Sequence, residues 1–125
     1  MIGFVTGGPR LILRLEGLGV LVGAITAYAS FDANWWVFVG LFFAPDVAIL
    51  PYLINSRAGG IAYNVAHTYL GPIGLAFCAH LGHAPAMLPF AAIWAAHIGF
   101  DRTLGFGLKY ETGFKDTHLG HPGRW

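Results

Sequence analysis

The chain has 125 residues, of which 56% are hydrophobic and only 10% charged, and its formal net charge is +1. A soluble domain of this size has too much surface for its volume to hide so much apolar area, and a typical one is about 25% charged. Length and composition therefore exclude a multidomain protein and predict a single membrane domain over residues 1–125. Cys78 has no second cysteine to pair with, and no basic patch with interleaved aromatic residues indicates nucleic-acid binding.

Four apolar segments are each close to the about 20 residues that an α-helix needs to cross about 30 Å of hydrocarbon. Short breaks with turn residues separate them, and such turns suit antiparallel neighbours. The sequence thus predicts an all-α protein, an up-down-up-down four-helix bundle with a C-terminal amphipathic cytoplasmic tail. The expected helices and tail cover about residues 11–29, 35–54, 58–80, 86–104 and 105–125.

The basic residues predict the orientation of this bundle. All seven precede or open the first segment, lie between the second and third, or end or follow the fourth, and the other two loops have none. For an even number of spans these three regions face the same side, and the positive-inside rule makes that side cytoplasmic. We therefore expect a multi-pass protein of a bacterial inner membrane with both termini in the cytoplasm. The basic residues are Arg10, Arg14, Arg57, Arg102, Lys109, Lys115 and Arg124.

Proline and glycine mark irregular points within the expected helices. Pro45 and Pro51 interrupt the second segment, and Gly71–Pro72 interrupts the third. In a bilayer such breaks are tolerated where neighbouring groups satisfy the freed carbonyls. On the first helix, Gly19 and Gly23 form a small-xxx-small pair, which predicts close approach of another helix there.

Polar residues on all four segments fall at similar depths in the cytoplasmic half of the bilayer. Counted at 1.5 Å per residue from the nearest cytoplasmic turn, most lie roughly 10–15 Å deep. A charge isolated in hydrocarbon costs at least about 2.5–3.5 kcal/mol, so these groups should face one another or a wet cavity. The expected layer consists of Glu16, Asp46, Asn64, His67, His97 and Asp101.

Two imidazoles and three carboxylates in such a layer predict a divalent metal site for Zn, Fe or Mn. His97 and Asp101 are four residues apart and so share one helix face. The expected metal ligands are Glu16, Asp46, His67, His97 and Asp101. The expected catalytic residues are Asn64, His67, His97 and Asp101. The alternative interpretation is that the layer is only hydrogen-bonded packing between helices.

Other polar residues carry weaker signals. Arg102, Lys109 and Lys115 are expected to hold an anionic lipid headgroup at the cytoplasmic surface, although they fit equally well as residues that only set the topology. Two H-x-x-H patterns, at residues 80–83 and 118–121, have metal-ligand spacing, but patterns of two residues arise easily by chance.

Four runs of the sequence carry a resemblance to a known family: RLEG (14–17), FFAPDVAILPYL (42–53), AYNVAHTY (62–69) and AHIGFDRTLGFGLKYETGFKDTHLG (96–120). The chain resembles, over most of its length, the family numbered 4260 among domains of unknown function, which are small bacterial membrane proteins. The resemblance implies a four-helix integral membrane protein. It supplies no activity and no catalytic residues.

Two functions compete on this evidence. The first is a membrane enzyme, metal-dependent, that acts on a lipophilic substrate entering from the cytoplasmic leaflet, by hydrolysis or oxidation. The second is an accessory subunit of a larger membrane complex, in which His67 and His97 bind a haem or a chlorophyll-type pigment. Membrane lipids, a homo-oligomer or a larger complex are the expected partners. A transport path has little support, because the outer half of the bundle has few polar residues.

Overall fold

The computed structural model describes residues 5–110, 114–115 and 117–120. Within these residues the chain forms five α-helices and two 3-10 helices, so the all-α prediction is confirmed. In chain order the elements are α1 (Gly7–Ser30), α2 (Trp35–Leu41), η1 (Ala44–Leu53), α3 (Ser56–His67), α4 (Leu70–Leu81), η2 (Pro85–Met87) and α5 (Leu88–Leu104).

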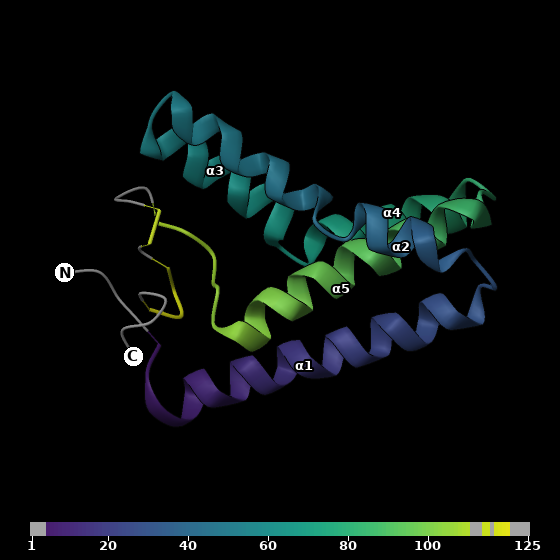
Figure 1. The fold of residues 1–125 in the computed structure, drawn as a ribbon, viewed down its shortest axis with the longest axis horizontal. Helices are drawn as coiled ribbons and strands as arrows, with labels where there is room; N and C mark the ends of the chain where they lie inside the picture. The colour runs from purple at the N-terminus through teal and green to yellow at the C-terminus, as the bar shows by residue number, and fades with distance from the viewer. Residues whose placement is uncertain (1–4, 111–113, 116, 121–125) are drawn as a thin grey trace.

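Helices α1 and α5 lie side by side and form the most extensive helix pair of the molecule (Figure 1). Their axes approach closely where Gly17 meets Gly99. A Cβ built on Gly99 would lie only 2.7 Å from the Gly17 carbonyl oxygen and 2.8 Å from the Leu21 nitrogen. Gly19 and Gly23, in contrast, have nothing within 4 Å of a built Cβ. The close contact that we expected at Gly19 and Gly23 is therefore made by Gly17, on a different face of α1.

The second expected helix is divided into α2 and η1. Asn34 caps α2, its side chain accepting a hydrogen bond from the Trp36 N–H. Pro45 occupies the first turn of η1 and Pro51 lies inside it. Proline lacks the N–H that an α-helix interior needs, and its ring clashes with the carbonyl four residues earlier. A continuous α-helix over residues 35–54 was therefore wrong, and residues 44–53 form a 3-10 helix.

The third expected helix, residues 58–80, is also divided. Thr68 is extended between α3 and α4, with φ −94° and ψ 145°. Pro72 lies in the first turn of α4, where a missing N–H costs nothing, whereas a helix that continued through Thr68 would clash with its ring. The break changes the packing as well, because α3 packs on η1 and α4 packs on α5.

Two side chains of α5 satisfy the carbonyls that this break frees. Trp94 donates its indole N–H to the Ala66 carbonyl at 2.6 Å, and Arg102 donates Nη2–H to the His67 carbonyl at 2.7 Å. Gly71 makes room for this contact, since a built Cβ there would collide with the Trp94 ring. The break is thus a fixed feature of the fold.

After α5 the chain crosses the end of the molecule toward α3 (Figure 1). Gly105 ends the helix in the left-handed region, with φ 92°, and the Phe106 N–H bonds back to the Asp101 carbonyl at 2.8 Å. The described part of the expected tail is irregular, with antiparallel bridges from Lys109 to Thr117 and from Thr117 to Gly120. Residues 111–113, 116 and 121–125 of that tail lie outside the described residues.

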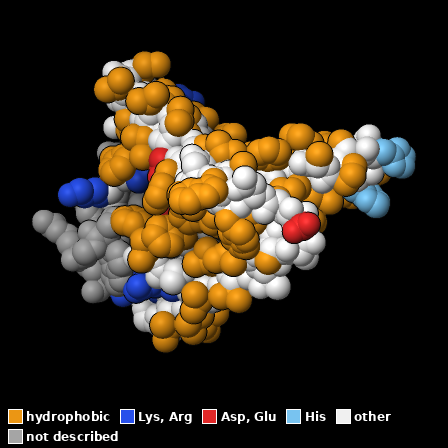
Figure 2. Space-filling model, turned by 45° about the vertical axis from the view of Figure 1, so that its right-hand side comes forward, with side chains coloured by type: hydrophobic (Ala, Val, Ile, Leu, Met, Phe, Trp, Pro, Cys, Tyr) orange, Lys and Arg blue, Asp and Glu red, His pale blue; other side chains and the backbone are white. Residues whose placement is uncertain are grey.

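Two helical stretches, Gly7–Ser30 and Trp35–Leu53, are long and apolar enough to cross a membrane. Few of their residues are buried, and the described hydrophobic core is small, with Tyr28, Ala92 and Ile93 at its centre. Figure 2 shows hydrophobic side chains over most of the visible face, Lys and Arg at one end and histidines at the other. An exposed apolar surface of this extent is typical of a protein that has apolar surroundings.

Candidate metal centre

Four side chains from three elements converge on one point. Asp46 comes from η1, His67 is the last residue of α3, and His97 and Asp101 lie one turn apart on α5. Nε2 of His67 lies 3.1 Å from Nε2 of His97 and 3.0 Å from Oδ1 of Asp46. Nε2 of His97 lies 3.2 Å from Oδ1 of Asp46 and 3.2 Å from Oδ2 of Asp101. His67 Nε2 lies 3.5 Å from Oδ2 of Asp101. We call these four residues the His/Asp cluster.

The spacing within the His/Asp cluster fits a bound ion. Its four ligand-type atoms lie within 4.8 Å of one another, and the five separations given above are all 3.0–3.5 Å. A tetrahedral ion about 2.0–2.1 Å from each nitrogen or oxygen ligand keeps the ligand atoms roughly 3.3–3.4 Å apart. Two imidazoles with two carboxylates are ligands that suit Zn, Fe or Mn. Donor chemistry and spacing therefore agree.

The local fold of α3 orients the His67 ring. Its Nδ1 lies 2.8 Å from the Tyr63 carbonyl oxygen, one turn earlier, so Nδ1–H donates and Nε2 keeps its lone pair. The Tyr63 ring stacks on the imidazole at 3.7 Å between centroids and 7° between planes. A histidine that ligates a metal through one ring nitrogen usually donates the N–H of its other ring nitrogen to a carboxylate, a backbone carbonyl or water. The imidazole is fully buried and faces the other three side chains.

The imidazole of His97 is held by packing. Phe42 and Phe43, at the junction of α2 and η1, present their ring edges to it, with centroids 5.5 Å and 5.9 Å away. His97 is fully buried, and its Nδ1 has no hydrogen-bond partner among the described residues. These phenylalanines therefore pack against an imidazole that is fully buried among the described residues. The contact of Phe42 and Phe43 with His97 was not predicted; its signal in the sequence is the FF pair directly before the A-P-D run.

The carboxylate side of the His/Asp cluster opens into a cavity of about 340 Å³, which we call the carboxylate cavity. The side chain of Asp46 is 36% exposed and that of Asp101 10%, whereas both imidazoles are fully buried. Among the described residues, the cluster is therefore approached from the side of the two carboxylates. The cavity is lined by Asp46, Ile49, Tyr63, Asp101, Phe106, Lys109, Phe114 and Lys115.

Asn64 holds the C-terminal segment against α3. Its Nδ2 donates to the Lys109 carbonyl at 2.7 Å, and its Oδ1 accepts from the Lys109 N–H at 2.6 Å. These two hydrogen bonds resemble those between paired β-strands and fix the position of the Lys109 backbone. Asn64 was an expected catalytic residue, and its side chain is committed to this contact instead of to the His/Asp cluster. Its catalytic role stays a prediction without geometric support.

Lys109 is buried beside the His/Asp cluster, although it lies beyond α5. Its Nζ donates to the Phe114 carbonyl at 2.7 Å and lies over two aromatic rings, 4.3 Å from the Tyr63 centroid and 3.6 Å from that of Phe114. Burial lowers the pKa of Lys109 from 10.5 to about 8, and the charges of Asp101 and Asp46 oppose that shift. The amine therefore loses its proton far more readily than an exposed lysine does.

The remaining predicted site residues are not brought to the His/Asp cluster. Glu16 is exposed on α1 and is not one of the four clustered residues, so a role as metal ligand stays a prediction without geometric support. Arg102 is buried and donates to the carbonyls of His67 and Phe106, which ties α5 to its neighbours. Lys115 is exposed and lines the carboxylate cavity.

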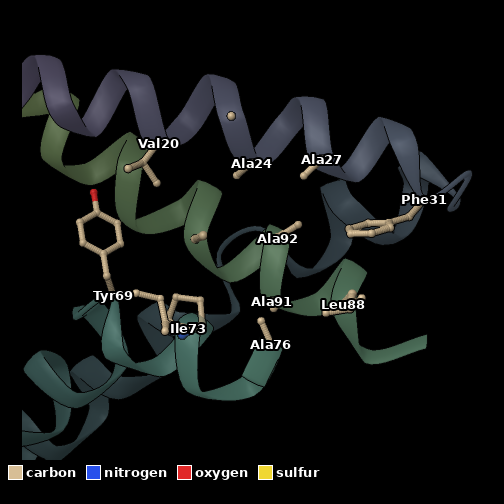
Figure 3. A pocket seen from close by; sticks show the side chains of 13 residues that line it. Val20, Ala24, Ala27, Phe31, Tyr69, Ile73, Ala76, Leu88, Ala91 and Ala92 are labelled. Atoms are coloured by element: carbon tan, nitrogen blue, oxygen red, sulfur yellow. The ribbon is translucent and has the colours of Figure 1, made fainter. Parts of the chain in front are cut away.

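A second cavity, of about 530 Å³, lies between α1, α4 and α5 (Figure 3). Its lining is apolar apart from Tyr69, whose hydroxyl is buried without a partner among the described residues. Ala91, Ala92 and Ala95 give it a wall on α5. At about 100° per residue these alanines lie roughly opposite to the clustered residues of the same helix. This cavity therefore does not open onto the His/Asp cluster.

Fold and site together define an all-α protein with strongly apolar helices and a largely buried group of two histidines and two aspartates, of which Asp46 is partly exposed. The model of a family described as a domain of unknown function (DUF4260) matches residues 10–121, so the chain belongs to that family, as the resemblance predicted. No curated protein and no solved structure matches the chain.

Proposed function

We propose that this protein binds one divalent transition-metal ion through Asp46, His67, His97 and Asp101 and uses it in a reaction on a lipophilic substrate. The observation that carries the proposal is the set of five separations of 3.0–3.5 Å among two imidazole nitrogens and two carboxylate oxygens. Without an ion, the buried Asp101 carboxylate and the partly exposed Asp46 carboxylate lie against two fully buried imidazoles whose Nε2 atoms are 3.1 Å apart. Burial makes such an arrangement costly unless a cation is bound.

We propose further that the protein is a multi-pass inner-membrane protein of a bacterium, with both termini in the cytoplasm. Two stretches are long and apolar enough to span a membrane, and many large hydrophobic side chains are exposed on the other helices. In Figure 1 the chain reverses direction from α1 to α2–η1, again to α3–α4, and again to α5, which supports four passes. The basic residues gather at one end, which the positive-inside rule assigns to the cytoplasm.

The chemistry follows from the two faces of the His/Asp cluster. A bound ion would act as a Lewis acid or lower the pKa of a coordinated water, which suits hydrolysis and leaves oxidation open. The phenylalanines behind His97 pack against its buried imidazole on one side, and the carboxylate cavity admits substrate from the other. Asp46, the more exposed carboxylate, is placed to accept a proton from a group bound in that cavity. The proposed site therefore has one open face.

The alternative, an accessory subunit that binds a haem or chlorophyll-type pigment, has less support. An axial ligand needs free space of ring size beyond its Nε2, but the Nε2 atoms of His67 and His97 lie 3.1 Å apart. A flat macrocycle does not fit between them. Membership of a larger membrane complex, or a homo-oligomer, stays a prediction that co-purification would test.

Metal analysis by mass spectrometry, with an absorption spectrum, tests the metal centre on detergent-purified protein. We expect about one equivalent of Zn, Fe or Mn in the wild type and its loss in His97→Ala and Asp101→Asn. Two matched controls, His80→Ala and Glu16→Gln, change an exposed histidine and the unclustered carboxylate and should keep the metal. A folded protein that takes up none of the three ions, or a His97→Ala variant that keeps a full equivalent, contradicts the proposal.

Cysteine labelling tests the membrane arrangement in a Cys78→Ala background. Asp32→Cys, in the turn after α1, should react with a membrane-impermeant maleimide in intact spheroplasts. Arg57→Cys, at the start of α3, should react only after the membrane is opened. Equal reactivity of the two cysteines in intact spheroplasts would rule out the proposed topology.

A further inference from the structure

We infer that the carboxylate cavity binds an anionic oxygen group of the substrate, a carboxylate or a phosphate, beside the metal ion. This inference rests on the proposed metal centre and goes beyond it, because it assigns the chemical class of the ligand. Three features of the cavity support the inference: the charges of its lining, the fixed position of the Lys109 ammonium group, and its apolar side chains.

The first feature is charge. Asp46 and Asp101 contribute two negative charges to the lining, and Lys109 and Lys115 contribute two positive charges when protonated. Without metal the charges of these four described residues balance. A divalent ion at the His/Asp cluster adds two positive charges, which leaves the cavity with a net positive charge in a largely apolar environment. An anion that enters the cavity restores the balance, so anion binding should depend on the metal.

The second feature is the fixed position of the Lys109 ammonium group. The Asn64 side chain pins its backbone, the Phe114 carbonyl takes one of its three N–H donors, and two rings flank it. Tyr63 stacks on the ligand His67 and also lies under the Lys109 Nζ, so one ring sets the spacing between metal ligand and ammonium. Among the described residues, the Phe114 carbonyl is the one hydrogen-bond acceptor given for this ammonium group, which leaves it able to donate to a ligand as well. An amine so constrained loses little conformational entropy when it binds an anion.

The third feature is the apolar part of the lining. Ile49, Phe106 and Phe114 stand beside the charged groups, and Phe106 and Phe114 are 37% and 45% exposed at the edge of the molecule. A volume of about 340 Å³ is within the range of small-molecule sites, roughly 300–1,000 Å³. These walls favour an anion that carries an apolar chain. Such a group comes either from a lipid headgroup or from a free anion, and the experiment separates the two.

The test uses Co²⁺-loaded protein in a neutral detergent, because the visible spectrum of Co²⁺ changes when a ligand joins its coordination sphere. We would titrate one sample with inorganic phosphate and another with dihexanoyl phosphatidic acid. We expect both to change the spectrum and the lipid to reach its midpoint at a concentration at least tenfold lower. Metal-free protein should bind neither anion in equilibrium dialysis with ³²P-labelled phosphate or labelled lipid.

Two lysine variants assign the binding to this cavity. Lys115→Gln changes an exposed residue and should raise the lipid midpoint severalfold, and Lys109→Met should raise it at least tenfold without loss of Co²⁺. Arg57→Gln removes a basic residue that does not line the cavity and serves as the matched control, with an unchanged midpoint. Should Lys109→Met fail to fold, Lys115→Gln still decides the question.

The outcomes are distinct from those for the metal centre. Protein that binds no Co²⁺ refutes the proposed function itself. Protein with a full equivalent of Co²⁺ and an unchanged spectrum with both anions overturns the anion inference and leaves the metal centre standing. Equal midpoints for phosphate and lipid support an anion site whose ligand is a free anion. Midpoints that neither lysine variant changes place the anion elsewhere and overturn the inference.

Discussion

The contact of Gly17 with Gly99 gives the sharpest test of the fold, through the substitution Gly99→Ala. A Cβ on Gly99 would lie 2.7 Å from a backbone oxygen and 2.8 Å from a backbone nitrogen of α1, whereas ordinary contacts begin near 3.4 Å. Backbone atoms cannot rotate aside as a side chain can, so α1 must move away from α5 by about half an ångström or more. Overpacking of this kind costs about 1–3 kcal/mol.

Thermal unfolding in mild detergent measures this effect, and Gly19→Ala is the matched control. At position 19 a Cβ meets nothing within 4 Å, so alanine there should gain about 0.5–1 kcal/mol from helix propensity. We expect Gly99→Ala to lower the midpoint by roughly 5–15 °C and Gly19→Ala to raise it by a few degrees. Metal content should stay unchanged in both. α1 supplies none of the clustered residues, and Gly99 faces α1, about 200° around the α5 axis from both His97 and Asp101. Equal shifts in the same direction would refute the close contact of α1 with α5.

Two further predictions concern the C-terminal segment. Asn64→Ala removes both hydrogen bonds to the Lys109 backbone, at a cost of about 2 kcal/mol, so amide hydrogen exchange at Lys109 should become roughly 30-fold faster. Asn34→Ala at the cap of α2 should leave that exchange unchanged, and an unchanged rate in Asn64→Ala would exclude the pairing. The pKa of Lys109 is about 8 in the folded protein and 10.5 in the unfolded chain. Between pH 8 and pH 10.5 the unfolded chain therefore binds more protons than the folded protein. The free energy of unfolding of metal-free protein should rise with pH across this window. Lys109→Met should abolish most of the rise in unfolding midpoint from pH 8 to pH 10.5, and a rise of the same size in the variant would contradict the assignment.

The four residues of the His/Asp cluster could be predicted from the sequence to lie near one another. Depth along each expected helix placed Asp46, His67, His97 and Asp101 in one layer, and their convergence is confirmed. Depth is predictable because the helical rise per residue is constant. α5 (Leu88–Leu104) and the C-terminal end of α1 at Ser30 were close to the expected 86–104 and residue 29, whereas α1 begins at Gly7, four residues before the expected residue 11.

Rotation about each helix axis could not be predicted in the same way. The residue that faces a neighbour depends on packing across the whole bundle, and consecutive residues differ by about 100°. Gly17 faces α5, and the adjacent Glu16 is therefore turned away from the His/Asp cluster. For the same reason Asn64 and His67, three residues apart on α3, have different partners: one pairs with Lys109 and the other with the cluster.

The break between α3 and α4 bears on the order in which the chain can assemble. Ala66 and His67 leave their carbonyls without helical partners, and the groups that bond them, Trp94 and Arg102, are synthesised about 30 residues later. In a bilayer an unpaired carbonyl costs several kcal/mol. Residues 56–81 therefore cannot adopt their final conformation, with the break at Thr68, until α5 has been synthesised. In a chain truncated before Trp94, residues 56–81 should stay at the membrane–water boundary or form a straighter helix. When α5 forms, it should fix the position of His67 and add His97 to the cluster in the same step.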